Sequence, residues 1–354
     1  QVLLTVSCSG TDYFRMRLRI PRRADVRLAD FDGVVVGDFL LKSEVEGFDI
    51  NRELRDYLST ELAVELETQV GLHSTTLEDE AVFEDPGVKA EMTKKVEAIV
   101  GDDCIFATNT STLPITELAK ASVRPEQFIG IHFFSPVDKM LLVEIIKGKE
   151  TGDRAVAKSL DYVRQIRKTP IVVNDARFFY ANRCIIPYIN EGIRMVGEGV
   201  NPALIENAAR YNGSPMGPLE TLDSISLETA YHAANQQRAD AEAAGDGWEA
   251  APESEVIRIM VEDAKRVGQV KGAGFYDYDD NGRKTTTWPG LKALFAAGGY
   301  VDVPFEDVKD RLLFPQVLEA IRIMEEGVLT SVGDGNIGSI MGIGFPPHTG
   351  GVYQ

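Results

Sequence analysis

The chain has 354 residues, 44% of them hydrophobic and 26% charged, a composition that excludes a disordered chain and predicts about two or three domains. The formal net charge is −18, from 37 basic and 55 acidic residues, so the overall field repels nucleic acids and anionic membranes. The first residues, Gln-Val-Leu-Leu, are not expected to be a secretory leader, and the sequence has no run of the roughly 18 apolar residues that a membrane span needs. The three cysteines, Cys8, Cys104 and Cys184, form no Cys-x-x-Cys pair, so neither a disulfide framework nor a metal site is expected. Such cysteine usage is typical of a protein of the reducing cytoplasm.

The amino-terminal region differs in composition from the rest of the chain. Residues 14–32 alternate arginine with apolar residues, a period of two that is typical of a β-strand. The apolar segment 34–41 is expected to form a buried strand or a short helix, and 52–70 has the spacing of a helix.

From about residue 80 onward, short apolar segments alternate with helical ones. This alternation favours an α/β domain whose sheet is substantially parallel. The expected strands are 104–108, 127–134, 141–146 and 170–173, and the expected helices cover 85–100, begin at 112, and cover 151–167.

After residue 174 no further strands are expected. The helical patterns lie at 181–197, 202–211, 252–267 and 308–326. Segment 237–252 is expected to be a solvated loop or helix end, and the glycine-rich segment 272–278 a turn. The chain is therefore expected to comprise an α/β domain at 1–173, atypical over 1–79, and helical domains at 174–285 and 286–354, the last of them truncated.

Polar residues stand at three of the expected strand ends. Asn109 and Ser111 directly follow one strand, His132 lies near the end of the next, and Glu144 interrupts the third. Because open parallel sheets bind ligands at the carboxyl ends of their strands, these side chains are expected to converge. A histidine beside a carboxylate, with hydroxyl and amide donors, is the set that removes a proton from an alcohol as its hydride leaves.

Other interpretations of these residues stay open. A histidine on an apolar strand is more often a core residue with a satisfied hydrogen bond, and Glu144 would face water if its strand were an edge strand. Segment 109–112 would equally serve as a helix N-cap. Asn182 and Arg183 lie near the first helix after the sheet and are expected to close the site from the second domain.

A dinucleotide site usually needs Gly-x-Gly-x-x-Gly after the first strand, so that a pyrophosphate can approach the backbone at a helix N-terminus. Residues 6–12 hold a single glycine, and the amino-terminal region has no such string. Asp30 or Asp32, near the end of a possible strand, is the candidate for the acidic residue that binds the ribose.

Several segments together resemble the 3-hydroxyacyl-CoA dehydrogenase family. The most specific is Gly-Ile-His-Phe-Phe-Ser-Pro-Val at 130–137, followed by Met140 and the strand around Glu144. The tail from Glu325 looks like the second carboxyl-terminal repeat of multifunctional fatty-oxidation α-subunits. The resemblance covers roughly residues 80–351, and its other segments are 80–84, 107–113, 175–183 and 215–219. One departure is Phe178, at a position where the family has glycine.

The resemblance implies a Rossmann-like dinucleotide-binding domain followed by all-α domains of the 6-phosphogluconate dehydrogenase C-terminal-like type. It implies that His132 is the general base, that Glu144 is its electrostatic partner, and that Ser111 and Asn182 contact the reacting oxygen. The expected contacts of the cofactor NAD are Glu84, Lys89, Asn109, Ser135 and Asp30.

The implied reaction is NAD-dependent oxidation of (3S)-3-hydroxyacyl-CoA to 3-ketoacyl-CoA in fatty-acid β-oxidation, for which no metal is needed. The implied partners are an acyl-CoA substrate and either a thiolase subunit or a second copy of the chain. One alternative is an acyl-CoA-binding or assembly subunit without a working dinucleotide loop. Another is a different β-hydroxyacid dehydrogenase, which the pair His132 and Glu144 argues against, because those families tend to use a lysine at the reacting centre.

Overall fold

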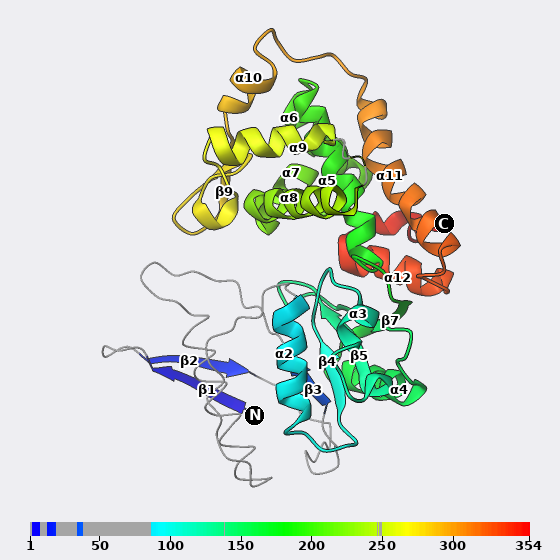
Figure 1. The fold of residues 1–354 in the computed structure, drawn as a ribbon. Helices are drawn as coiled ribbons and strands as arrows, with labels where there is room; N and C mark the ends of the chain where they lie inside the picture. The colour runs from blue at the N-terminus through cyan, green and yellow to red at the C-terminus, as the bar shows by residue number, and fades with distance from the viewer. Residues whose placement is uncertain are drawn as a thin grey trace. The chain divides into compact units, whose positions relative to one another are not determined.

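The structure is a computed structural model that describes residues 86–354, except 138, 246, 248 and 249. Within residues 1–85 it describes the backbone of three strands, β1 (Val2–Ser7), β2 (Tyr13–Leu18) and β3 (Val34–Gly37). The expected helix at 52–70 lies outside the described residues, as do the candidates Asp30 and Glu84. Two compact units make up the chain (Figure 1), Gln1–Val137 with Val143–Arg177 and Asp138–Leu142 with Phe178–Gln354.

The strand expected within the arginine-rich segment is confirmed over β2, which pairs antiparallel with β1. In the segment 34–41, the strand alternative is the one observed, over β3.

The first unit is built on a five-stranded sheet with the order β3-β4-β5-β6-β7. β3, β4 and β5 are parallel, whereas β6 runs antiparallel to β5. The connection from β5 to β6 is too short to hold a crossover helix, so the chain turns back on itself. The four expected strands are confirmed as β4 (Ile105–Thr108), β5 (Phe128–Phe133), β6 (Leu142–Lys147) and β7 (Thr169–Asn174).

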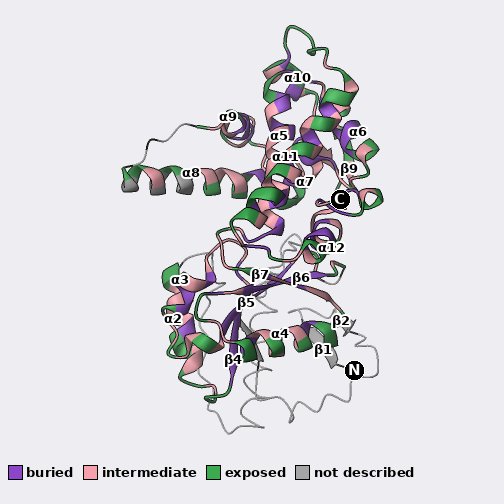
Figure 2. Ribbon diagram, turned by 90° about the vertical axis from the view of Figure 1, so that its right-hand side faces the viewer, coloured by how far each residue is buried: buried purple, intermediate pink, exposed green. Residues whose placement is uncertain are grey.

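The core of this unit lies along β4 and β5, which are buried over their whole length (Figure 2). The expected helices are confirmed as α2 (Pro86–Glu97), α3 (Ile115–Ala119) and α4 (Asp153–Gln165). α4 buries Ala155, Ser159 and Val163, a spacing of four residues that places them on one face. Ala155 and Val163 belong to the same apolar cluster as the residues of β4, β5 and β6, and a fully buried valine such as Val163 stabilises the fold by about 1.5–3 kcal/mol.

The second unit is mainly helical and confirms the four expected helical regions. It also holds features that the sequence did not predict, namely α7, α8 and the two-stranded antiparallel sheet of β8 (Tyr276–Tyr278) and β9 (Lys284–Thr287). The expectation of no strand after residue 174 is therefore wrong. The helices are α5 (Ala181–Gly197), α6 (Pro202–Asn212), α7 (Pro218–Ile225), α8 (Leu227–Ala244), α9 (Pro252–Arg258), α10 (Gly290–Phe295), α11 (Phe305–Glu325) and α12 (Val332–Ile343).

Of the loop and the helix end expected at 237–252, the helix end is observed, because α8 continues to Ala244. Alanine and glutamate in this segment are good helix formers, and Gly245, with φ +76°, provides the left-handed residue that ends the helix. Among the helices of the described residues, none is long and apolar enough to cross a membrane.

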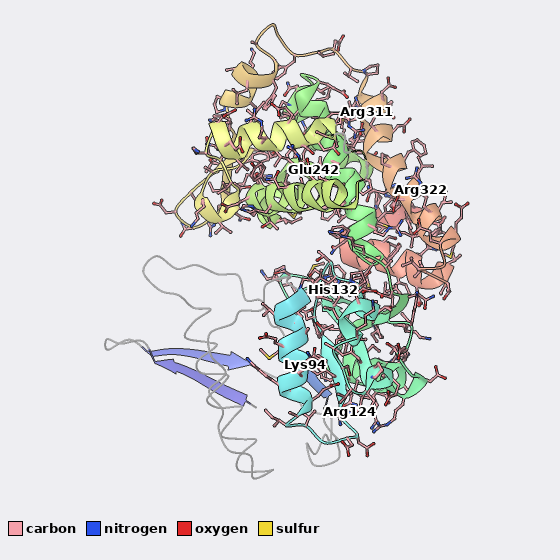
Figure 3. All side chains as sticks on the ribbon, viewed as in Figure 1. Lys94, Arg124, His132, Glu242, Arg311 and Arg322 are labelled. Carbon is pink, nitrogen blue, oxygen red and sulfur yellow. The ribbon has the colours of Figure 1, made fainter. Side chains whose placement is uncertain are left out.

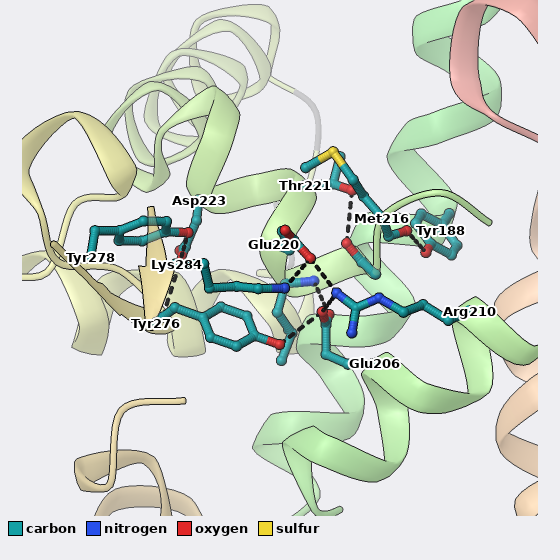
Figure 4. Close-up of polar contacts among 12 residues, drawn as sticks. Tyr188, Glu206, Arg210, Met216, Glu220, Thr221, Asp223, Tyr276, Tyr278 and Lys284 are labelled. Atoms are coloured by element: carbon teal, nitrogen blue, oxygen red, sulfur yellow. Dashed lines mark hydrogen bonds and ion pairs between the residues drawn. The ribbon is translucent and has the colours of Figure 1, made fainter. Parts of the chain in front are cut away.

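Two buried carboxylates fasten the β8–β9 hairpin to α6 and α7 (Figure 4). Asp223 accepts hydrogen bonds from the backbone N–H groups of Phe275 at 2.8 Å and Tyr276 at 2.9 Å, and from the Tyr278 hydroxyl at 2.9 Å. Glu206 accepts from the Tyr276 hydroxyl at 2.9 Å. Each buried oxygen therefore has a donor, as burial of a carboxylate requires.

Two glycines lie so close to these carboxylates that a residue with a side chain would not fit in their place. A Cβ at Gly274 would lie 2.0 Å from Asp223 Oδ1, and one at Gly217 would lie 2.3 Å from the Glu206 carboxylate. Of the turn that the sequence predicts at 272–278, residues 272–275 are irregular and 276–278 form β8, and Gly274 lets the Asp223 carboxylate reach the backbone.

Asp223 is expected to make the stability of the second unit depend on pH. Burial raises the pKa of Asp223 to about 6, above its ordinary value of 3.8. The folded state therefore binds the proton more tightly, and the unfolding free energy should fall by about 2–3 kcal/mol as pH rises from 4 to 7. We expect the difference in unfolding free energy between wild type and Asp223→Asn to decrease by this amount over the same pH range. Urea unfolding at each pH measures it.

The matched control is Asp161→Asn, which removes an exposed carboxylate on α4. Its difference from wild type should stay constant over the same pH range. A difference between wild type and Asp223→Asn that grows with rising pH would contradict the prediction.

Candidate active site

His132 and Glu144 are direct cross-strand partners on β5 and β6. His132 Nδ1 lies 2.7 Å from Glu144 Oε2, and the two residues are 4% and 0% exposed. Figure 3 places His132 at the end of the first unit opposite Arg124, which precedes β5 in the chain. This is the carboxyl end of the parallel strands, where a sheet of this kind binds its ligands.

The pairing fixes the chemistry of the imidazole. A carboxylate only accepts hydrogen bonds, so Nδ1 carries the proton that it donates to Glu144. In the neutral ring Nε2 then has the lone pair, which makes it the basic nitrogen. If Nε2 takes a proton, the resulting imidazolium lies beside the Glu144 charge and is stabilised by it.

The position of Glu144 decides between the interpretations that the sequence left open. β6 lies between β5 and β7, so Glu144 is on an interior strand and does not face water. The interpretation of Glu144 as an edge-strand residue is therefore wrong.

The loop after β4 reaches the end of β5. Asn109 Oδ1 accepts a hydrogen bond of 2.9 Å from the backbone N–H of Phe133, the residue after His132. Thr110 Oγ1 accepts from the backbone N–H of Leu113 at 3.1 Å, which closes the turn that carries Ser111. Asn109 thus links the end of β4 to the end of β5, and Thr110 holds the turn between β4 and α3, whose N-cap residue is Pro114.

Asp175 is a residue of this region that the sequence analysis missed. Its two carboxylate oxygens accept hydrogen bonds from the backbone N–H groups of Ile115 at 2.8 Å and Thr116 at 2.7 Å, at the start of α3. Its own N–H donates to Lys147 O at the end of β6. Sixty residues separate Asp175 from the helix that it caps, so no local spacing could have revealed the contact.

Two other candidates for cofactor contacts, Lys89 and Ser135, lie among the described residues. Lys89 on α2 is 6% exposed, and a buried ammonium is a suitable partner for an anionic group. Ser135 follows β5 directly, three residues after His132, and precedes Pro136 through a cis peptide bond. Within the described part of the chain, no group of histidine, cysteine or acidic residues could hold a metal ion.

Asn182 lies in the second unit, in the first turn of α5. Just before it, Phe178 and Phe179 have φ values of +65° and +52°. The left-handed region that favours glycine is therefore occupied at Phe178, the position where the family has glycine. The departure costs backbone strain of about 1–2 kcal/mol at that residue.

We expect Phe178→Gly to unfold with a free energy about 1 kcal/mol larger than Phe178→Ala, since both variants remove the ring but glycine alone relieves the left-handed strain. Thermal and urea unfolding of the two variants measure this difference. Equal stabilities, or a more stable alanine variant, would show that the left-handed backbone carries no strain here.

One string of the form Gly-x-Gly-x-x-Gly does stand in the chain, at 333–338, far from the amino-terminal region. It lies inside α12 and does not follow a strand. A Cβ at Gly335 would lie 2.3 Å from the Tyr353 ring, so this glycine serves helix packing.

Comparison with known proteins identifies the family. The model of the 3-hydroxyacyl-CoA dehydrogenase NAD-binding domain matches residues 40–176, and the model of the family's C-terminal domain matches residues 179–278. The first match begins well before residue 80, so the expectation that 40–79 lies outside the resemblance is wrong.

Solved structures give the same result. The dehydrogenase part of multifunctional enzyme 1 from C. elegans is 30% identical, with a TM-score of 0.54 over 76% of this chain and 61% of that chain. A (S)-3-hydroxybutyryl-CoA dehydrogenase from Ralstonia eutropha is 30% identical, with a TM-score of 0.52 over 65% of this chain and 87% of that chain. The 3-hydroxybutyryl-CoA dehydrogenase of Escherichia coli shares the fold, with a TM-score of 0.61 at 20% identity over 84% of this chain and 83% of that chain.

The chain thus spans about three fifths of the length of the C. elegans dehydrogenase part that it matches. Its first unit has the Rossmann-like fold of an NAD-binding domain, so NAD is the cofactor of this fold, and its second unit is the helical domain that accompanies it. The two family models together match about two thirds of the chain, which therefore belongs to the 3-hydroxyacyl-CoA dehydrogenase family.

Proposed function

We propose that the protein oxidises (3S)-3-hydroxyacyl-CoA to 3-ketoacyl-CoA with NAD⁺ as the hydride acceptor, in fatty-acid β-oxidation, and catalyses the reverse reduction. The observation that supports this most directly is the buried pair of His132 and Glu144, at the carboxyl end of the parallel strands of an NAD-binding unit.

In this proposal His132 Nε2 takes the proton of the substrate's 3-hydroxyl as the C3–H bond breaks and the C3–O bond becomes a carbonyl. Glu144 keeps the proton on Nδ1 and stabilises the imidazolium that forms. When bound, NAD⁺ supplies the acceptor for the hydride that leaves C3. In the reverse direction the imidazolium returns its proton to the carbonyl oxygen.

The remaining residues bind and orient. Ser111 is proposed to contact the reacting oxygen from the loop between β4 and α3, and Asn182 from the first turn of α5. The proposed contacts of the cofactor's ribose, phosphate and nicotinamide are Asp30, Glu84, Lys89, Asn109 and Ser135. The proposed domain boundaries remain 1–173, 174–285 and 286–354.

We also propose the cytoplasm as the location, since the three cysteines of the sequence form no Cys-x-x-Cys pair and are an odd number. The proposed partners are an acyl-CoA substrate and either a thiolase subunit or a second copy of the chain.

A second function is favoured by one observation of the sequence. Residues 1–20 hold a single glycine, at position 10, where a phosphate-binding loop would need several. On this ground the alternative is a subunit that binds acyl-CoA, or assembles other subunits, without turnover.

Two measurements separate the proposals. The first is oxidation of NADH by the purified chain in the presence of acetoacetyl-CoA, followed by NAD⁺ reduction with (3S)- and (3R)-3-hydroxybutyryl-CoA and with longer acyl chains. The second is titration of the protein with NADH by fluorescence. We expect NADH binding, turnover, and a strong preference for the (3S) substrate.

Binding of acetoacetyl-CoA without NADH binding would establish the second function instead. NADH binding without turnover of any acyl-CoA would overturn the proposed substrate class and leave the NAD-binding fold in place.

A further inference from the structure

The first turn of α5, which carries Asn182, is held by helices that lie beyond the residues matched by the family models. Those models end at residue 278, whereas α11 and α12 cover Phe305–Glu325 and Val332–Ile343. Both helices contact α5 (Figure 1). The contacts that hold the turn come from Tyr180, at the N-cap position, and from Arg183, within the first turn.

Arg183 ties α5 to the end of α11. Its Nε donates to Glu319 Oε1 at 2.8 Å, and its Nη1 donates to Glu326. The side chains of Arg183 and Glu319 are 16% and 15% exposed, so this pair is largely shielded from water. Charge-assisted bonds from a planar guanidinium to two carboxylates fix direction as well as distance.

Tyr180 ties the same turn to α12. It is 0% exposed, and its hydroxyl donates to Gly335 O at 2.6 Å. Gly335 is itself packed tightly, since a Cβ there would lie 2.3 Å from the Tyr353 ring. Tyr180 and Arg183 are three residues apart and lie on one face of the helix, whereas Asn182 points about 100° away from Arg183.

A helix usually fixes its first turn with a short N-cap side chain such as serine or aspartate. α5 has Tyr180 at the N-cap position, and no cap hydrogen bond comes from its side chain. Tertiary contacts therefore take the place of a local cap in setting the position and rotation of this turn.

We propose that Arg183 is a positioning residue, which through Glu319 and Glu326 sets the direction of Asn182 toward the substrate. Helices α11 and α12 then support the active site by holding the turn that carries Asn182, although neither helix supplies a reacting group. This inference rests on the proposed function, because it takes Asn182 to be a contact of the substrate.

The experiment compares Arg183→Gln, Arg183→Lys and Arg322→Gln in the full chain. Arg322 is the matched control, since it also bonds Glu319, at 3.2 Å, but is 63% exposed and lies on α11 itself. We expect Arg183→Gln to lower kcat for acetoacetyl-CoA reduction by about tenfold through displacement of Asn182, without a change in the NADH dissociation constant. Arg183→Lys should recover part of the loss, and Arg322→Gln should match wild type.

The same substitution in an Asn182→Ala background separates positioning from a merely structural role. If Arg183 acts through Asn182, Arg183→Gln should change kcat by less than about twofold there. An equal loss in both backgrounds would overturn the proposal, and so would a loss shared by Arg322→Gln.

Hydrogen exchange gives a readout that does not depend on turnover. We expect the amides of 181–186 to exchange faster in Arg183→Gln than in wild type, and at the wild-type rate in Arg322→Gln. Unaltered exchange in Arg183→Gln would show that the bonds of Arg183 to Glu319 and Glu326 do not hold this turn, and would overturn the proposal. If exchange changes as expected but wild type turns over no acyl-CoA, the proposed function has failed, and the role of Arg183 in catalysis fails with it. The conclusion that Arg183 holds the first turn of α5 would remain.

Discussion

Replacing His132 with alanine is expected to lower kcat for acetoacetyl-CoA-dependent oxidation of NADH by about 10²- to 10⁴-fold, the usual contribution of an acid–base residue. The reason is geometric. Glu144 fixes the proton on Nδ1 at 2.7 Å, so Nε2 is the nitrogen that exchanges a proton with the substrate oxygen. The initial rate of NADH oxidation, measured at saturating acetoacetyl-CoA, is the test.

Two comparisons make this result specific. His232→Ala removes an exposed histidine on α8 and should retain the wild-type rate. The cavity left by His132→Ala should allow added imidazole to restore part of the activity, whereas the bulkier His132→Gln should not respond. The NADH dissociation constant should be the same in all variants, because His132 is not placed at the cofactor. A His132→Ala variant with a kcat within a few-fold of wild type would remove His132 from the mechanism.

Glu144→Gln is expected to separate activity from stability. The amide has the shape of the carboxylate and can accept the bond from Nδ1, and the change removes a fully buried charge together with its desolvation cost. We therefore expect the unfolding free energy to stay within about 1 kcal/mol of wild type. The amide cannot stabilise the imidazolium, so kcat should fall by about 10²- to 10⁴-fold.

The control is Glu117→Gln on α3, whose side chain is 61% exposed, and it should change neither quantity. In the double variant His132→Ala with Glu144→Gln, the rate should be close to that of His132→Ala alone, because the two residues act as one unit. If Glu144→Gln loses stability and activity in parallel, Glu144 is a structural partner of His132 and not an electrostatic one.

The secondary structure of the first unit was largely predictable from the sequence. Strands β4, β5, β6 and β7 and helices α2 and α4 were predictable, because short apolar segments and helical periodicity are local properties of the chain. The anomaly of Glu144 was also local, since a carboxylate within an apolar strand needs a partner when it is buried.

The second unit shows where local patterns fail. The β8–β9 hairpin contains too few residues to show a period of two, and the start of β8 is held by Asp223, about fifty residues earlier in the chain. The sequence leaves the end of α8 open between a loop and a helix end, because this alanine- and glutamate-rich segment has no apolar face to mark it. Arg183 was itself expected to close the site, yet its two carboxylate partners on and after α11 were not marked by any local spacing.

The sequence by itself determined the fold class, the helical second part and the identity of His132 and Glu144 as the pair to examine, since residue type and short-range spacing carry that information. The tertiary structure decided that the two residues are cross-strand partners, that β6 is an interior strand, and that Asp175 and Arg183 hold segments carrying other candidates. Those facts depend on which distant segments pack together. That packing is set by the hydrophobic burial and hydrogen bonding of the whole chain, and not by any window of neighbouring residues.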